Sequence, residues 1–327
     1  MSIWKVVSHC KTTKRGGFGE TLWPRDEHCP ARIIITPMTD ISAVSPSIAD
    51  MLRGFSIEVN PGEPKVIDAA PQRLDPGTEV FMTWIPGKNP MDTIGPAKKL
   101  RDAGLYPTPH IGARHVESAA QLDEVAGRLV REAGVDRVLI IAGDRDTPAG
   151  PFDSSLAVMQ SGILQKAGIS RISVGGFPEG NPKIPDPLLW EAIAAKTKFA
   201  RENGLNLTIV TQFAFASEPV VDWIRKVRAQ GIDNPIRIGF AGPASLIALA
   251  RYAMVCGVGA SMKVLTEKPQ FAKLLIDKGP EPLIREVADL CGPSNGSALP
   301  LGIKGVHFFV FGGFNKTVDW INAQRVQ

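Results

Sequence analysis

Eight short apolar runs alternate with helical patterns from residue 55 to the end of the chain, and this alternation limits the fold to two architectures. A parallel sheet follows from it, either closed as a (β/α)8 barrel or open and doubly wound. The length from 55 to 327 suits a barrel, which takes about 250 residues. Because no strand is followed by a GxGxxG or P-loop sequence, we predict a (β/α)8 TIM barrel. The strand-like runs lie at 55–59, 79–85, 108–112, 138–142, 172–176, 207–213, 236–240 and 306–311, and the helical patterns at 91–103, 117–133, 153–167, 187–203, 217–230, 244–256, 268–290 and 315–325.

The fourth run ends in a carboxylate. Four consecutive branched apolar residues, 138–141, predict an internal parallel strand that is buried on both faces. Two small residues follow, Ala142 and Gly143, and then Asp144. Barrels keep their reactive groups at the carboxyl ends of strands, so Asp144 is a candidate catalytic residue. It equally fits a cap for the next helix or a solvated loop residue.

Polar residues also end other predicted strands. Glu58 stands inside FSIEVNP, where a carboxylate pointing into a barrel is costly unless it is protonated or hydrogen-bonded. Such burial raises the pKa of a carboxyl group and suits a general acid, whereas an outward-facing Glu58 would be merely solvated. His110 and Gln212 also fit ordinary roles as hydrogen-bonded core residues. The strand ends give Glu58, Thr83, His110, Asp144, Glu179, Thr211 and Gln212 as candidates.

Composition excludes several classes of protein. The net charge of +4 is spread over interspersed charges without a basic block, so nucleic-acid binding is not predicted. Apolar runs are shorter than a membrane span, no signal peptide is recognisable, and a cytoplasmic location is expected. The pairs at 9–10 and 28–29, each His followed by Cys, lack zinc-ligand spacing, so no metal site is predicted. We expect residues 1–54, with a helix at 46–53, to be an N-terminal extension packed on a barrel domain of residues 55–327; homo-oligomerisation is left open.

Six motifs occur in the order typical of one enzyme family. They are FSIE at 55–58, PHIGAR at 109–114, AGD at 142–144, GGFPEGNP at 175–182, TQFAF at 211–215 and VHFF at 306–309. In these the chain resembles the methylenetetrahydrofolate reductase family. The resemblance implies a (β/α)8 barrel that binds FAD at the carboxyl ends of its strands. A reduced nicotinamide, NADH or NADPH, and the folate substrate methylenetetrahydrofolate would take turns on the flavin.

The resemblance also assigns roles to matching positions. Glu58 corresponds to the general acid that helps to open the bridging methylene to an iminium ion. Asp144 corresponds to the carboxylate near the flavin ring and the pterin, and Gln212 to an amide that contacts the folate. Four further positions match flavin contacts: Thr83, His110, Gly175 and Asp186.

The chain departs from the family mainly at flavin contacts. Ala142, Phe152, Phe177 and Asn181 stand where the family has arginine, tyrosine, tyrosine and histidine. Each lost contact would weaken cofactor binding by ~1–3 kcal/mol. We therefore expect FAD to bind, but weakly. The alternatives are a flavin-independent reductase, a folate-dependent methyl or methylene transferase, and a folate- or flavin-binding protein that has lost catalysis.

Overall fold

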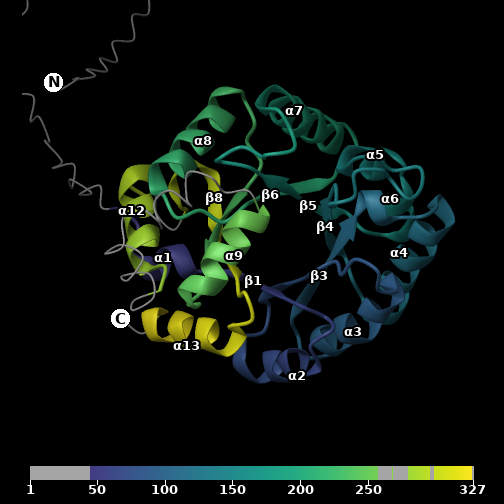
Figure 1. Cartoon of the computed structure of the whole chain (residues 1–327), viewed down its shortest axis with the longest axis horizontal. Helices are drawn as coiled ribbons and strands as arrows, with labels where there is room; N and C mark the ends of the chain where they lie inside the picture. Colours follow the sequence, from purple (N-terminus) through teal and green to yellow (C-terminus); the bar gives the residue numbers. More distant parts are fainter. Residues whose placement is uncertain (1–44, 257–266, 268–278, 295–297, 326–327) are drawn as a thin grey trace, which may run out of the picture. The chain divides into compact units, whose positions relative to one another are not determined.

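In the computed structural model, eight parallel strands close into a barrel in sequence order (Figure 1). The structure describes residues 45–256, 267, 279–294 and 298–325, which all belong to the compact unit Ala43–Gln327. The predicted (β/α)8 fold is confirmed. The strands are β1 (Ser56–Val59), β2 (Glu79–Met82), β3 (Tyr106–Gly112), β4 (Arg137–Ile141), β5 (Arg171–Gly176), β6 (Asn206–Thr211), β7 (Ile236–Ala241) and β8 (Ile303–Phe309).

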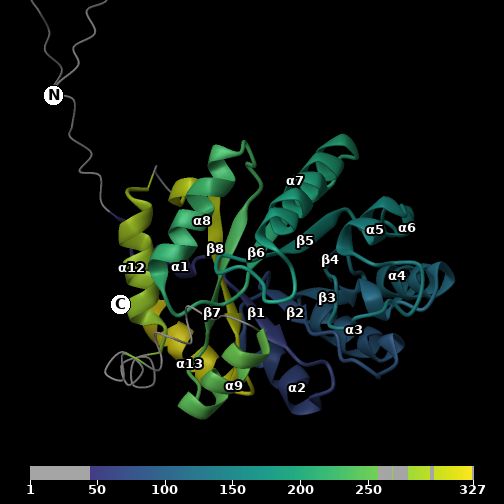
Figure 2. The same ribbon diagram turned by 45° about the horizontal axis from the view of Figure 1, so that its top comes forward.

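Helices surround the strands, as the two views in Figures 1 and 2 show. The α4 sequence illustrates why they form: Ser118 caps its first turn, Leu122 and Leu129 face the core, and Gly134 ends it at φ 59°. The helices are α1 (Ile48–Leu52), α2 (Pro64–Arg73), α3 (Ile94–Asp102), α4 (Ala119–Ala133), α5 (Ser155–Gln160), α6 (Ile163–Ala167), α7 (Asp186–Glu202), α8 (Ser217–Ala229), α9 (Leu246–Cys256), α12 (Glu281–Cys291) and α13 (Phe314–Arg325), with short 3-10 helices η1 (Pro90–Thr93), η2 (Ala113–His115) and η3 (Pro300–Gly302).

Three helical segments differ from the sequence prediction. Helix α2 was not predicted; it begins with Pro64 in its first turn and tolerates Pro71 near its end. The single helix predicted at 153–167 is divided into α5 and α6, because Gly162 adopts φ 71°. Of the helix predicted at 268–290, residues 268–278 lie outside the described residues, and α12 covers the remainder.

The predicted helix at 46–53 is present as α1. Ser47 and Asp50 form a capping box at its start, and Met51 and Leu52 are fully buried. This helix contacts β8, α12 and α13. Residues 1–44 of the predicted extension lie outside the described part of the chain. Within that part, no helix has the length and apolar character that a membrane span requires.

The barrel has a large outer core and a small, mixed interior. Most buried apolar residues lie between the strands and the helices, whereas the interior holds an apolar cluster of Phe81, Leu139 and Val210. Val138, Leu139 and Ile140 are all buried, as predicted for an internal strand. The barrel strands also carry buried polar residues: Ser56, Thr108, Ser173, Thr211 and His307.

Candidate active site

Glu58 of β1 points into the barrel. Its Oε2 atom lies 3.8 Å from Nε2 of His110 on β3, although β2 separates the two strands. About 19% of the Glu58 side chain is exposed, so solvent reaches it, yet burial raises its pKa to about 8. The carboxyl group is therefore mostly protonated at pH 7. The alternative of an outward-facing, solvated glutamate is wrong.

His110 is a neutral partner to Glu58. Burial lowers the pKa of His110 to about 3, so the imidazole carries no charge near pH 7. The 3.8 Å separation is too long for a hydrogen bond, and His110 Nε2 has no hydrogen-bond partner among the described residues. An uncharged ring cannot offset the desolvation of a carboxylate, which explains why the Glu58 pKa stays high. A buried ring nitrogen without a partner can also receive a bound ligand.

Three further rings, those of Phe81, His307 and Phe309, form a chain of contacts that begins at His110. The Phe81 ring lies 4.7 Å from His307 and 6.1 Å from His110, and His307 lies 4.8 Å from Phe309. Nδ1 of His307 is 2.9 Å from Oγ of Ser56, and burial, aided by nearby Arg237, holds the pKa of His307 well below its usual value. His307 was not among the predicted site residues, although it lies in the VHFF motif at 306–309.

Asp144 follows β4 and is paired with a histidine. Its Oδ1 atom lies 2.6 Å from Nε2 of His115, in η2 after β3, and this hydrogen bond is the main cause that lowers the Asp144 pKa. About 75% of the Asp144 side chain is exposed, so it is an anion at the barrel mouth. The helix-cap alternative is wrong, because Ser154 caps α5. His115 was not predicted, since it follows the PHIGAR motif by one residue.

Gly143 lets Asp144 and His115 meet. It adopts φ 91°, and a Cβ atom there would lie 2.8 Å from Cδ2 of His115. A larger residue would therefore strain the backbone and press on the ring. The other side of His115 faces Trp84, with ring centroids 6.1 Å apart. This packing fixes the imidazole against the carboxylate.

Gln212 follows β6 at the same end of the barrel. Its backbone N–H donates to the Gly176 carbonyl, and its side-chain oxygen accepts from the Phe213 N–H at 3.1 Å. These contacts fix the orientation of the amide. Thr211 has a structural role, because its buried hydroxyl accepts from the Gly239 N–H at 2.9 Å. Of the predicted residues, Glu58 and His110 thus lie on β1 and β3, inside the barrel. Asp144 and Gln212 lie just beyond the carboxyl ends of β4 and β6.

The predicted flavin contacts fall into two groups. Gly175 and Asp186 line a hollow of about 260 Å³ beside α7 and α8, together with the stacked rings of Trp190 and Trp223. Thr83, half-buried after β2, and His110 do not line that hollow.

The four residues that we expect to replace flavin contacts are apolar or already hydrogen-bonded. The Phe177 ring covers Gly175, with Cζ 3.3 Å from the position of an added Cβ, and Phe152 is buried in the core. The Asn181 side chain accepts from the Lys183 N–H. The Ala142 carbonyl accepts from the backbone N–H of Arg114, in η2 after β3. These four positions therefore offer a cofactor such as FAD few polar side-chain contacts, whereas the hollow beside α7 and α8 is also lined by Lys196 and Lys226.

Metal ligands are not grouped in the described residues: no three His, Cys, Asp or Glu side chains there could hold an ion. His9, Cys10, His28 and Cys29 lie outside them. Cys291 of α12 is a half-buried thiol, and its burial raises its pKa to about 11, so it is unreactive near neutral pH.

Comparison with known families identifies the barrel. Residues 62–271 match the family model described as methylenetetrahydrofolate reductase, which is more than half of the chain. The match includes Asp144, His110 and Gln212 but begins after Glu58, whose place in the site rests on the structure. By this match, and by its closed eight-stranded barrel, the chain belongs to the methylenetetrahydrofolate reductase family.

Proposed function

We propose that this protein reduces 5,10-methylenetetrahydrofolate to 5-methyltetrahydrofolate, with NADH or NADPH as the reductant. Family membership supports oxidoreductase chemistry on a folate. The observation that carries the proposal is the position of the Glu58 carboxyl inside the barrel, 3.8 Å from His110, where burial raises its pKa to about 8. A carboxylic acid that keeps its proton at pH 7 can act as a general acid.

The reaction needs one proton donor and one hydride donor. Glu58 gives its proton to the folate nitrogen that leaves the bridging carbon, so the carbon–nitrogen bond breaks and an iminium ion remains on the other nitrogen. Hydride from the nicotinamide then adds to the iminium carbon and gives the methyl group. The ionised Glu58 left behind stabilises the cationic iminium, and solvent reaches its partly exposed side chain to restore the proton.

Asp144 and Gln212 orient the folate in this proposal. Asp144 is an anion whose pKa is lowered mainly by His115, so it can accept hydrogen bonds from the amino and N–H groups of a pterin. Gln212 offers an amide that Phe213 holds in place. Both follow strand ends on the same face of the barrel, where substrates of such barrels bind.

A flavin-independent reaction is the form that we propose. It is supported by the Phe177 ring over Gly175 and by the buried Phe152. The weak FAD binding expected from the sequence stays a prediction, and it is the alternative to this form. In the flavin-independent form, hydride passes directly from the nicotinamide to the folate.

The test combines a spectrum with a rate. Purified protein is scanned for flavin absorbance, and oxidation of reduced nicotinamide is then followed with and without methylenetetrahydrofolate, with and without added FAD. Folate-dependent oxidation by colourless protein, with 5-methyltetrahydrofolate as the product, supports the proposal. Activity that appears only with FAD refutes the flavin-independent form, and absence of folate reduction under every condition refutes the proposed function.

A further inference from the structure

A second hollow, of about 380 Å³, lies at the amino ends of the strands. Its lining includes Glu79, Arg137, Arg171, Asn206, Thr208 and Lys304. Most of these are the first or second residues of their strands, whereas Asp144 and Gln212 follow the last residues of theirs. The hollow is therefore at the end of the barrel opposite the candidate active site. We call it the amino-end hollow.

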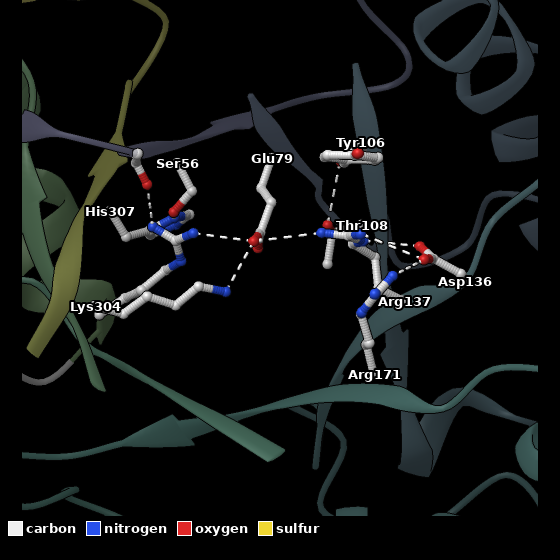
Figure 3. Close-up of polar contacts among 11 residues, drawn as sticks. Ser56, Glu79, Tyr106, Thr108, Asp136, Arg137, Arg171, Lys304 and His307 are labelled. Carbon is white, nitrogen blue, oxygen red and sulfur yellow. Dashed lines mark hydrogen bonds and ion pairs between the residues drawn. The ribbon is translucent and has the colours of Figure 1, made fainter. Parts of the chain in front are cut away.

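Glu79 alone pairs with three cations in this region. Its Oε1 atom lies 2.9 Å from Lys304, 3.0 Å from Arg237 and 3.3 Å from Arg137. Burial by itself would raise the pKa of Glu79, but these three cations lower it to about 2. Figure 3 shows Glu79 between Lys304 on one side and Arg137 on the other. Glu79 is thus fully ionised at neutral pH, and its single charge is shared among three positive groups.

Asp136 is the second carboxylate of the cluster. It forms ion pairs with Arg137, at 2.8 Å, and with Arg171, as Figure 3 also shows. Arg237 does not line the hollow; it is almost completely buried, and its guanidinium donates to Glu79 and to the Gly54 carbonyl. Three cations, Arg137, Arg171 and Lys304, line the hollow together with one carboxylate, that of Glu79, which leaves an excess of two positive charges in its lining. Unbalanced charge in a partly buried site is costly, and a bound anion would offset it.

We propose that the amino-end hollow binds a phosphomonoester. A phosphate group carries nearly two negative charges at neutral pH, which matches the excess, and arginine donors suit its oxygens. Thr208 and Asn206 add a hydroxyl and an amide to the lining. The volume falls within the ~300–1,000 Å³ of small-molecule sites, so it has room for a phosphate and a small organic group. This site is independent of the proposed reductase function.

Calorimetric titration of the full chain tests the proposal with three probes: AMP, inorganic phosphate and adenosine. We expect saturable 1:1 binding of AMP and none of adenosine, which lacks the anion. Asn206→Asp places a carboxylate in the lining beside Arg171, its partner in the strand register, and should weaken AMP binding by on the order of tenfold or more. Asn89→Asp is the matched control, because Asn89 is an exposed residue of the loop after β2, at the opposite end of the barrel.

The outcomes separate the sources of the anion. Tighter binding of AMP than of phosphate assigns the site to an ester, and equal binding assigns it to free phosphate; both support an anion site. Arg171→Gln is a second variant, because Arg171 is about half exposed. Loss of its positive charge should also weaken AMP binding. Absence of saturable binding by AMP and phosphate, or equal weakening by Asn206→Asp and Asn89→Asp, would overturn the proposal.

Discussion

Replacing Glu58 by glutamine removes the titratable proton and keeps the shape of the side chain. We expect folate reduction to fall by ~10²–10⁴-fold, the range for loss of a general acid. We also expect Glu58→Gln to be more stable than the parent, because folding moves the Glu58 pKa from 4.5 to about 8. In the parent, this shift costs nothing below pH 4.5, costs about 3 kcal/mol at pH 7, and reaches about 5 kcal/mol above pH 8.

Two measurements check that Glu58→Gln loses activity but gains stability. Chemical denaturation of the parent and of Glu58→Gln across pH 4–9 gives the difference in unfolding free energy, which should grow as the pH rises from 4.5 to about 8. The parent rate should fall as the pH rises through about 8, where the acid loses its proton. Glu63→Gln, at an exposed position before α2, is the control and should change neither quantity.

The reasoning would be refuted by a Glu58→Gln protein that folds normally and reduces methylenetetrahydrofolate at the parent rate. A stability difference that does not change with pH would contradict the burial of a protonated carboxyl group. If only the rate fails to change, Glu58 is buried and protonated as described but is not the proton donor.

Three further changes test other parts of the structure. His115→Phe keeps the ring but loses the hydrogen bond to Asp144; the Asp144 pKa should rise toward its usual value, and the acidic limb of the pH–rate profile should move to higher pH. An unchanged profile would show that this pair does not tune the reaction. Gly143→Ala should cost at least about 1 kcal/mol more than Gly87→Ala in denaturant titrations, because both glycines have positive φ but only Gly143 has a ring atom at 2.8 Å. Equal costs would contradict the close approach. Glu79→Gln should destabilise the protein by about 3–5 kcal/mol, since it leaves buried cations unpaired, and the parent should lose this stabilisation as the pH falls from 4.5 towards 2. A neutral effect on denaturation would rule out that pairing.

The strands were predictable because each is a short apolar run with a definite end. Val138, Leu139 and Ile140 are buried as their branched, apolar character requires. Helix α2 was missed because Pro71 reads as a helix breaker, although it lies near the end, where the loss of one backbone donor is tolerated. Gly162 divides α5 from α6 through a positive φ that a hydrophobic pattern does not reveal.

The site was only partly predictable, because its chemistry depends on register. The rule that reactive groups follow barrel strands located Glu58, Asp144 and Gln212. It could not supply His115 as the partner of Asp144, which comes from the adjacent loop. Nor could it supply His307, which meets Ser56 from a position 251 residues away. The Ser56–His307 contact follows from the pairing of β1 with β8, and the Asp144–His115 contact from the pairing of β3 with β4. Neither pairing has a local signal in the sequence.

Because β8 closes the barrel, the raised pKa of Glu58 can arise only late in the synthesis and folding of the chain. The first strand carries Glu58, but the rings of His307 and Phe309 reach its surroundings only when the last strand has been synthesised and has paired with β1. Until then the carboxyl group remains in water, with an ordinary pKa, and gives up its proton at neutral pH. The acid that we assign to catalysis is thus made by long-range closure rather than by its own segment. Glu58 is thus synthesised early, but its carboxyl group holds a proton at neutral pH only after the barrel has closed.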